Sequence, residues 1–193
     1  MQSAAAIRYI IAKLENELPG HLHYHNAAHT LDVMQASEAF GKAEGLRAAE
    51  LTLLNTAAAY HDAGFLCAYD DHEEHSCRIA RESLPGFGYG ERQIDRCCEL
   101  ILFTLPGHLP DDPLAAILCD ADLDYLGRPD YPDIAAKLRK EWEAIGKSYE
   151  DDAWIQMQIA YLQQHQYRTA SARQQREAGK VANIRYLKKL RQH

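Results

Sequence analysis

Histidine and aspartate residues in three separate segments are the side chains of this sequence best suited to chemistry. His25 and His29 are four positions apart, so on a helix they face the same side. His61 and Asp62 follow a run rich in alanine and leucine, which places an imidazole and a carboxylate at the edge of a buried helix. Asp122 is the middle one of three acids within five positions. A buried carboxylate is costly unless it is paired or binds a metal, so these groups need partners.

Two kinds of chemistry fit these residues. The simpler one is helix capping, in which an aspartate accepts hydrogen bonds from backbone amides. The other is a shared cation, because two imidazoles and two carboxylates are nitrogen and oxygen ligands suited to Mn, Fe, Ni, Co, Zn or Mg, with positions left for water. Residues two apart on a helix point about 200° apart, so Asp120 and Asp122 are expected to have different roles.

Three segments together resemble the HD-domain superfamily of metal-dependent phosphohydrolases. The resemblance covers roughly residues 20 to 130, and the segments follow the superfamily's order of His, His-Asp and Asp. Parts of it are also similar to cyclic-nucleotide phosphodiesterases. The segments are Tyr24-His25-Asn26-Ala27-Ala28-His29, Tyr60-His61-Asp62 and Asp120-Ala121-Asp122-Leu123.

The resemblance implies a compact all-α domain with a metal site. By position in the motifs, the metal ligands would be His29, His61, Asp62 and Asp122. Asp122 is preferred over Asp120 because the superfamily's aspartate usually follows a small residue and precedes an apolar or basic one. The implied cofactor is a divalent metal ion (Mn, Mg, Fe, Co, Ni or Zn), either one ion or two.

The resemblance also implies a reaction. The chain would hydrolyse a phosphate monoester, a phosphodiester or a nucleotide by attack of metal-bound hydroxide on phosphorus. Asp62 would bind the metal and orient the water, and His25 would protonate the leaving oxygen. His72 opens a later helix and would bind a second metal or the substrate phosphate. On that helix the two following acids, Glu73 and Glu74, are expected to turn away from the face of His72.

Two further segments have open roles. His108 lies in a loop after a helix, where it would either bind a second metal or take no part in the site. The basic segment 165–176 could clamp a phosphate, because guanidinium groups form paired hydrogen bonds with phosphate. A surface turn between helices is the favoured interpretation of that segment.

Two other functions are compatible with the same scaffold. Some relatives with this fold hold two irons and use dioxygen instead of water, and His72, His75 and His108 are available as additional iron ligands. The second alternative is a regulatory domain that binds a nucleotide without turnover, and the complete ligand set argues against it. Two irons per chain would favour the first alternative, and tight nucleotide binding without metal-dependent turnover would favour the second.

The candidate residues need a helical frame to bring them together. Apolar side chains recur with the period of a helix along most of the chain, and no stretch shows the sustained alternation of a strand. Asn26 is an expected N-cap, as is Asp111 or Asp112 before a proline. We therefore predict an all-α fold. The predicted helices span roughly 7–18, 26–43, 47–62, 71–84, 90–105, 112–126, 132–146, 151–167 and 171 onward, the last one broken near Gly179.

The composition suits one globular domain over residues 1–193, with 165–193 as a helical extension. A net charge of −7 works against binding to nucleic acid or an anionic membrane. A small phosphorylated, nucleotide-like substrate remains compatible, because a bound cation can reverse the local field. No apolar run is long enough to cross a bilayer and the N-terminus lacks a signal peptide, so a cytoplasmic location is expected. Five cysteines without a C-x-x-C spacing predict reduced thiols.

Overall fold

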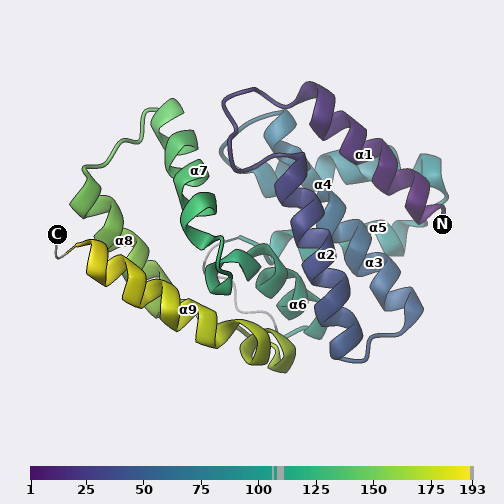
Figure 1. The fold of residues 1–193 in the computed structure, drawn as a ribbon. Coiled ribbons are helices and arrows are strands. Elements are labelled where there is room, and N and C mark those ends of the chain that lie inside the picture. Colours follow the sequence, from purple (N-terminus) through teal and green to yellow (C-terminus); the bar gives the residue numbers. More distant parts are fainter. Residues whose placement is uncertain (106, 108–110, 192–193) are drawn as a thin grey trace.

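The computed structural model describes residues 1–105, 107 and 111–191, and every regular element in that part of the chain is a helix (Figure 1). The predicted all-α fold is therefore confirmed. The α-helices and the short 3-10 helices (η) are α1 (Ser3–Glu17), α2 (Ala27–Ala43), α3 (Ala48–Tyr60), η1 (Ala63–Leu66), α4 (His72–Ser83), η2 (Leu84–Phe87), α5 (Glu91–Leu102), α6 (Pro113–Asp122), η3 (Asp124–Gly127), α7 (Tyr131–Ala144), α8 (Asp151–Gln164) and α9 (Ala170–Leu190).

The helices α1 to α6 enclose the larger of two apolar cores. Within this core α2 packs against α3 and α6, while α5 packs against α3 and α4. Phe40 of α2, Tyr60 of α3 and Leu118 of α6 are fully buried there. Burial of each such side chain stabilises the fold by roughly 1.5–3 kcal/mol. The three helices are thus held in fixed positions relative to one another, and the ends of these helices carry the candidate site residues.

The helices α7 to α9 form a smaller apolar core around Tyr131, Leu162 and Leu187. Figure 1 shows these helices grouped on the side of α6 that is remote from α1. Tyr24, which precedes α2, also packs into this smaller core. The segment before α2 therefore lies where the two cores meet.

The starts of α2 and α6 follow the capping that the sequence predicts. The side chain of Asn26 accepts hydrogen bonds from the backbone amides of Ala28 (3.0 Å) and His29 (3.3 Å). Asp112 caps the first turn of α6 in the same way. Such caps satisfy amides that have no partner within the helix. The first cap fixes the turn that carries His29.

The predicted break near Gly179 is wrong, because α9 continues through this position. Gly179 lies against Gly127 of η3, so close that an added Cβ would stand 1.9 Å from the Gly127 carbonyl oxygen. The absence of a side chain at Gly179 thus allows α9 and η3 to approach each other closely. Three helices end three or four positions earlier than predicted, α5 at Leu102, α6 at Asp122 and α8 at Gln164.

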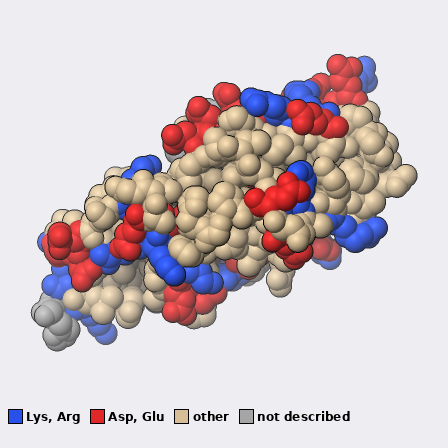
Figure 2. All heavy atoms as spheres, turned by 90° about the horizontal axis from the view of Figure 1, so that it is seen from above, with Lys and Arg blue, Asp and Glu red and all other residues tan. Residues whose placement is uncertain are grey.

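The surface carries charges of both signs. On the face shown in Figure 2, acidic and basic side chains are interspersed. The five cysteines are free thiols as expected, and only Cys67 is exposed. Among residues 1–105, 107 and 111–191, no helix combines the length and the apolar character that a membrane span requires.

Candidate metal centre

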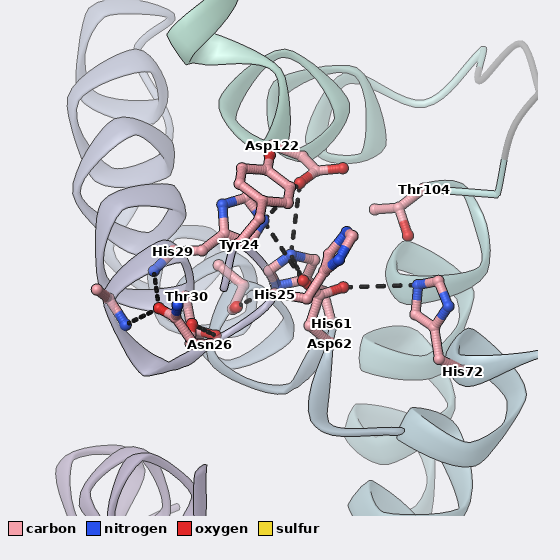
Figure 3. A network of polar contacts seen from close by, with 12 residues as sticks. Tyr24, His25, Asn26, His29, Thr30, His61, Asp62, His72, Thr104 and Asp122 are labelled. Carbon is pink, nitrogen blue, oxygen red and sulfur yellow. Dashed lines mark hydrogen bonds and ion pairs between the residues drawn. The ribbon is translucent and has the colours of Figure 1, made fainter. Parts of the chain in front are cut away.

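Four side chains from distant parts of the sequence meet at one point (Figure 3). They are His29 in the first turn of α2, His61 and Asp62 directly after α3, and Asp122 at the end of α6. The Nε2 atom of His29 lies 3.1 Å from Oδ1 of Asp122 and 3.4 Å from Oδ2 of Asp62. The Nε2 atom of His61 lies 3.2 Å from Oδ2 of Asp62 and 3.5 Å from Oδ1 of Asp122. The structure thus brings together all four residues that the sequence suggested as metal ligands.

The hydrogen bonds of His61 and Asp62 test whether a cation fits between these groups. His61 Nδ1 lies 2.8 Å from the Ala58 carbonyl oxygen, to which it donates a hydrogen bond, so the lone pair of the neutral ring is on Nε2. Both His61 Nε2 and Asp62 Oδ2 are buried and, within the described part of the chain, make no hydrogen bond. Unpartnered buried polar atoms are costly. A cation shared between them would supply the missing partner, so these residues fit a metal ion.

The ring of ligand atoms is small enough for one ion. One nitrogen of His29, one nitrogen of His61 and one carboxylate oxygen of Asp122 all lie within 4.8 Å of one another. Bonds of about 2.0–2.2 Å from nitrogen and oxygen to an ion such as zinc require ligand atoms at such separations. His29 and His61 are each at most 9% exposed, so the ligand atoms are shielded from bulk water.

The charges in the cluster support the same conclusion. Burial alone lowers the pKa of His29, but its hydrogen bond to Asp122 and the nearby negative charge of Asp62 outweigh it and raise the pKa to about 9. The pKa of His61 is likewise raised, because the two carboxylates outweigh burial. Burial raises the pKa of each aspartate, but the two imidazoles outweigh it and lower both pKa values. Two carboxylates thus demand neutralising positive charge, which protons or a metal ion can supply.

Asp120 points away from the cluster and has a different role. Its buried carboxylate accepts hydrogen bonds from the backbone amides of Arg168 (2.8 Å) and Thr169 (2.7 Å), and from the Thr169 hydroxyl (2.7 Å). These bonds tie α6 to the residues that precede α9. The geometry thus separates Asp120 from Asp122, as their spacing on a helix leads us to expect.

His25 lies beside the cluster and is held by a residue of α7. The ring centroids of His25 and His29 are 5.9 Å apart. His25 Nδ1 contacts Oε1 of Glu141, and Phe65 of η1 stacks on the His25 ring at a centroid distance of 4.4 Å. The Phe65 ring also stacks with that of His72, at a centroid distance of 4.1 Å.

His72 lies next to Asp62, as expected of a second residue at the site. His72 Nε2 is 3.6 Å from Oδ1 of Asp62 and 3.3 Å from Oε1 of Glu73. The expectation that Glu73 turns away is wrong, since Glu73 is only 4% exposed. The first turn of α4 packs directly on η1, where an added Cβ on Gly64 would stand 1.8 Å from the His72 carbonyl oxygen. This close packing buries more than one face of the turn.

Two candidates remain, His108 and the basic segment 165–176. His108 lies outside the described residues. In the segment 165–176, Arg173 donates to the carbonyl oxygen of Arg168 (2.6 Å), and Arg176 forms an ion pair with Asp124 (2.5 Å). These contacts within the chain favour the interpretation of this segment as a structural turn.

Sequence reasoning missed Glu141, although a signal for it exists. Glu141 stands 116 positions from His25 and is fully buried. It falls on the same helical stripe as Ile134, Leu138 and Ile145, with spacings of four, three and four positions. An acid on an apolar helix face is a buried polar group that needs a partner. Phe65 and Glu73 had no comparable signal, because their position depends on the packing of η1 against α4.

Comparisons with known proteins agree with this geometry. Bacillus subtilis YpgQ, whose crystal structure was determined in complex with ADP, is 20% identical, with a TM-score of 0.70 over 100% of this chain and 96% of YpgQ. A predicted HD superfamily hydrolase from an uncultured Thermotogales bacterium is 19% identical, with a TM-score of 0.64 over 95% of this chain and 90% of that protein. At these identities the likeness concerns the fold. No curated protein sequence matches the chain. The HD-domain family model matches residues 26–124, which include all four clustered side chains, and the chain therefore belongs to the HD-domain family.

Proposed function

We propose that this protein is a metal-dependent phosphohydrolase that acts on a phosphate monoester, a phosphodiester or a nucleotide. The observation that carries the proposal is the convergence of His29, His61, Asp62 and Asp122 around two buried polar atoms that find no hydrogen-bond partner among the described residues. These four residues would hold the divalent ion, with one ion as the minimum that the cluster requires.

The residues around the cluster have complementary tasks. A divalent ion at this place would lower the pKa of a bound water and stabilise negative charge on a phosphoryl group. Asp62 directs Oδ2 to the imidazoles and Oδ1 towards His72, so it can bind the ion and orient a water with different oxygens. His25 is the proton donor to the leaving oxygen, through its Nε2 atom. His72 contacts a phosphoryl oxygen.

A nucleotide is the preferred substrate class within this proposal. The support is the ADP complex of YpgQ, a protein with the same fold along the whole chain. The mixed charges on the face shown in Figure 2 and a net charge of −7 offer little general attraction for a phosphate. Binding of an anionic substrate would therefore depend on the metal ion itself.

The test combines metal analysis with a substrate screen. We expect purified protein to bind a divalent metal and to release phosphate or a nucleoside phosphate in the presence of Mn, Mg, Co or Ni. His61→Ala and Asp62→Ala should lose both metal and turnover. His25→Ala should keep the metal and lower turnover by about a hundredfold or more, the usual size of general acid catalysis. His21→Ala is the matched control, because His21 is exposed and, like His25, lies in the segment that precedes α2.

Four results would contradict the proposal. Retention of metal by His61→Ala would reject the ligand set, and loss of metal in His25→Ala would make that residue a ligand instead of an acid. Two irons per chain with an oxygen-dependent reaction would indicate an oxygenase on this scaffold. Tight nucleotide binding without any metal-dependent turnover would indicate a regulatory domain.

A further inference from the structure

Glu141 is a fully buried carboxylate that four groups contact. Its Oε2 atom accepts hydrogen bonds from the backbone amides of Tyr24 (2.8 Å) and His25 (2.9 Å). Its Oε1 atom accepts one from the Tyr69 hydroxyl (3.1 Å) and contacts Nδ1 of His25. Glu141 belongs to α7, outside residues 26–124 that the HD-domain family model matches. His25 itself lies one position before the matched residues, so both partners of this contact are outside them.

The surroundings of Glu141 determine where the proton of His25 resides. Backbone amides can only donate, so Oε2 cannot carry a proton between them. Burial alone raises the pKa of Glu141, but the bonds to His25 and to the two amides outweigh it and lower the pKa. Glu141 is thus an ionised acceptor on both oxygens. Nδ1 of His25 must then be the donor, which leaves Nε2 as the ring nitrogen that can exchange a proton with another molecule.

Phe65 restricts the remaining freedom of the His25 ring. The two rings are stacked, with an angle of 22° between their planes. Rotation of the imidazole would break both this stacking and the contact with Glu141. The ring is also close to the cluster, since its centroid is 5.9 Å from that of His29.

We propose that Glu141 is a positioning residue, which holds His25 as the Nδ1–H tautomer and presents its Nε2 atom to the substrate. The role assigned to Nε2 rests on the proposed function, whereas the tautomer itself does not. A purely structural role is the competing explanation, because the two amide bonds alone would fasten α7 to the segment before α2. The two explanations differ in what happens to the His25 proton when Glu141 is changed.

Glu141→Gln is the informative substitution. Glutamine has nearly the same shape as glutamate, but its side chain has only one acceptor oxygen. The four groups around Glu141 contact two acceptor oxygens. The NH2 group of the glutamine must face one of two pairs. It faces either the two backbone amides, or the Tyr69 hydroxyl together with His25 Nδ1. Glu143→Gln is the matched control, since Glu143 lies on the same helix, is exposed and pairs only with Arg139 among the described ion pairs.

The first readout is nitrogen NMR of the full chain labelled with 15N-histidine, in excess Mg²⁺ and along a pH titration that reaches the neutral ring. The His25 signal is assigned by its loss in His25→Gln. We expect Nδ1–H in the wild type, a shift towards Nε2–H in Glu141→Gln, and no change in Glu143→Gln or Tyr69→Phe. Nε2–H in the wild-type chain overturns the proposal even if Glu141→Gln does not fold, and so does an unchanged tautomer in folded Glu141→Gln.

The second readout is kinetic. With any substrate that the wild type hydrolyses, Glu141→Gln should lower kcat by about tenfold or more and change KM by less than about twofold, as for loss of an oriented general acid. In a His25→Gln background the same change should lower kcat by less than about twofold, because both act through one group. Equal losses in both backgrounds overturn the proposal. If no substrate is hydrolysed, the proposed function fails while the NMR result still decides the tautomer.

Discussion

Ser76 shows how a single side chain supports the turn that carries His61 and Asp62. The buried Ser76 hydroxyl donates a hydrogen bond to the His61 carbonyl oxygen (2.6 Å) and accepts one from the backbone amide of Gly64 (2.8 Å). It therefore joins α4 to both ends of the turn between α3 and η1. The ligand pair depends on a residue that would never touch the metal.

We predict that Ser76→Ala lowers the free energy of unfolding by about 1–3 kcal/mol, because two buried backbone groups lose their partner. Urea unfolding of the metal-free chain measures this change. Thr52→Ala removes a hydroxyl whose one hydrogen bond within the described residues goes to a carbonyl of its own helix, and should cost less than about 0.5 kcal/mol. Equal losses in the two variants would show that the Ser76 contacts do not stabilise the turn.

At this scale the sequence predicts residues whose role is local. Asn26 caps the helix that it precedes, and the spacing of Asp120 and Asp122 separates their directions, because both effects act within a few positions of one element. Glu73 and Glu141 escaped prediction because their burial depends on packing between elements far apart in the chain. Only the position of Glu141 on an apolar helix stripe hinted at its role.

The contact between η3 and α9 is decided by two glycines. A Cβ on Gly127 would stand 2.4 Å from the Arg176 carbonyl oxygen, and a Cβ on Gly179 would stand 1.9 Å from the Gly127 carbonyl oxygen. Both obstacles are backbone atoms, which cannot move aside like a flexible side chain. The two elements can therefore pack at this distance only without side chains at these positions.

We predict that Gly179→Ala destabilises the fold although alanine favours a helix by about 1 kcal/mol. The clash should outweigh this gain and lower the free energy of unfolding by about 1–3 kcal/mol, as overpacking usually does. Gly20→Ala is the control, because a Cβ there meets no atom within 4 Å. Urea unfolding compares the variants, and a more stable Gly179→Ala would disprove the close contact.

Helix periodicity made most helices predictable, whereas some helix boundaries depend on contacts between elements. The apolar stripes and the expected caps located the helices, since both are written in neighbouring residues. The uninterrupted course of α9 through Gly179 was not predictable, because intrinsic preference favours a break and only the contact with Gly127 explains the glycine. The early end of α6 at Asp122 likewise coincides with the cluster.

At the scale of the whole molecule, the candidate ligands connect α2, the end of α3 and the end of α6. Asp120 and Glu141 extend this connection to the residues before α9 and to α7. We propose that residues 1–193 form a single domain, and we expect one cooperative unfolding transition. A separate transition for the last helices, observed by calorimetry, would instead make residues 165–193 an independent extension.

Metal binding should stabilise this whole unit, and the gain should grow with pH. At a free metal concentration about a hundred times Kd, the expected gain is about 3 kcal/mol. In the metal-free fold the pKa of His29 is raised to about 9, above its ordinary value. The stability that its proton provides is complete below about pH 6.5 and is lost as the pH rises through about 9. The metal ion and this proton compete for His29. The metal-induced rise in Tm should therefore increase as the pH rises from about 6.5 to about 9.

Thermal unfolding with excess metal and with EDTA, at several pH values, measures this competition. Asp122→Asn should abolish most of the metal-induced rise at every pH, because it removes one of the two carboxylates while leaving the apolar core intact. It should also lower the pKa of His29, since its hydrogen bond to Asp122 is the largest of the effects that raise it. A metal-induced rise that is independent of pH would show that binding displaces no proton from the imidazoles, and that the cation is held elsewhere.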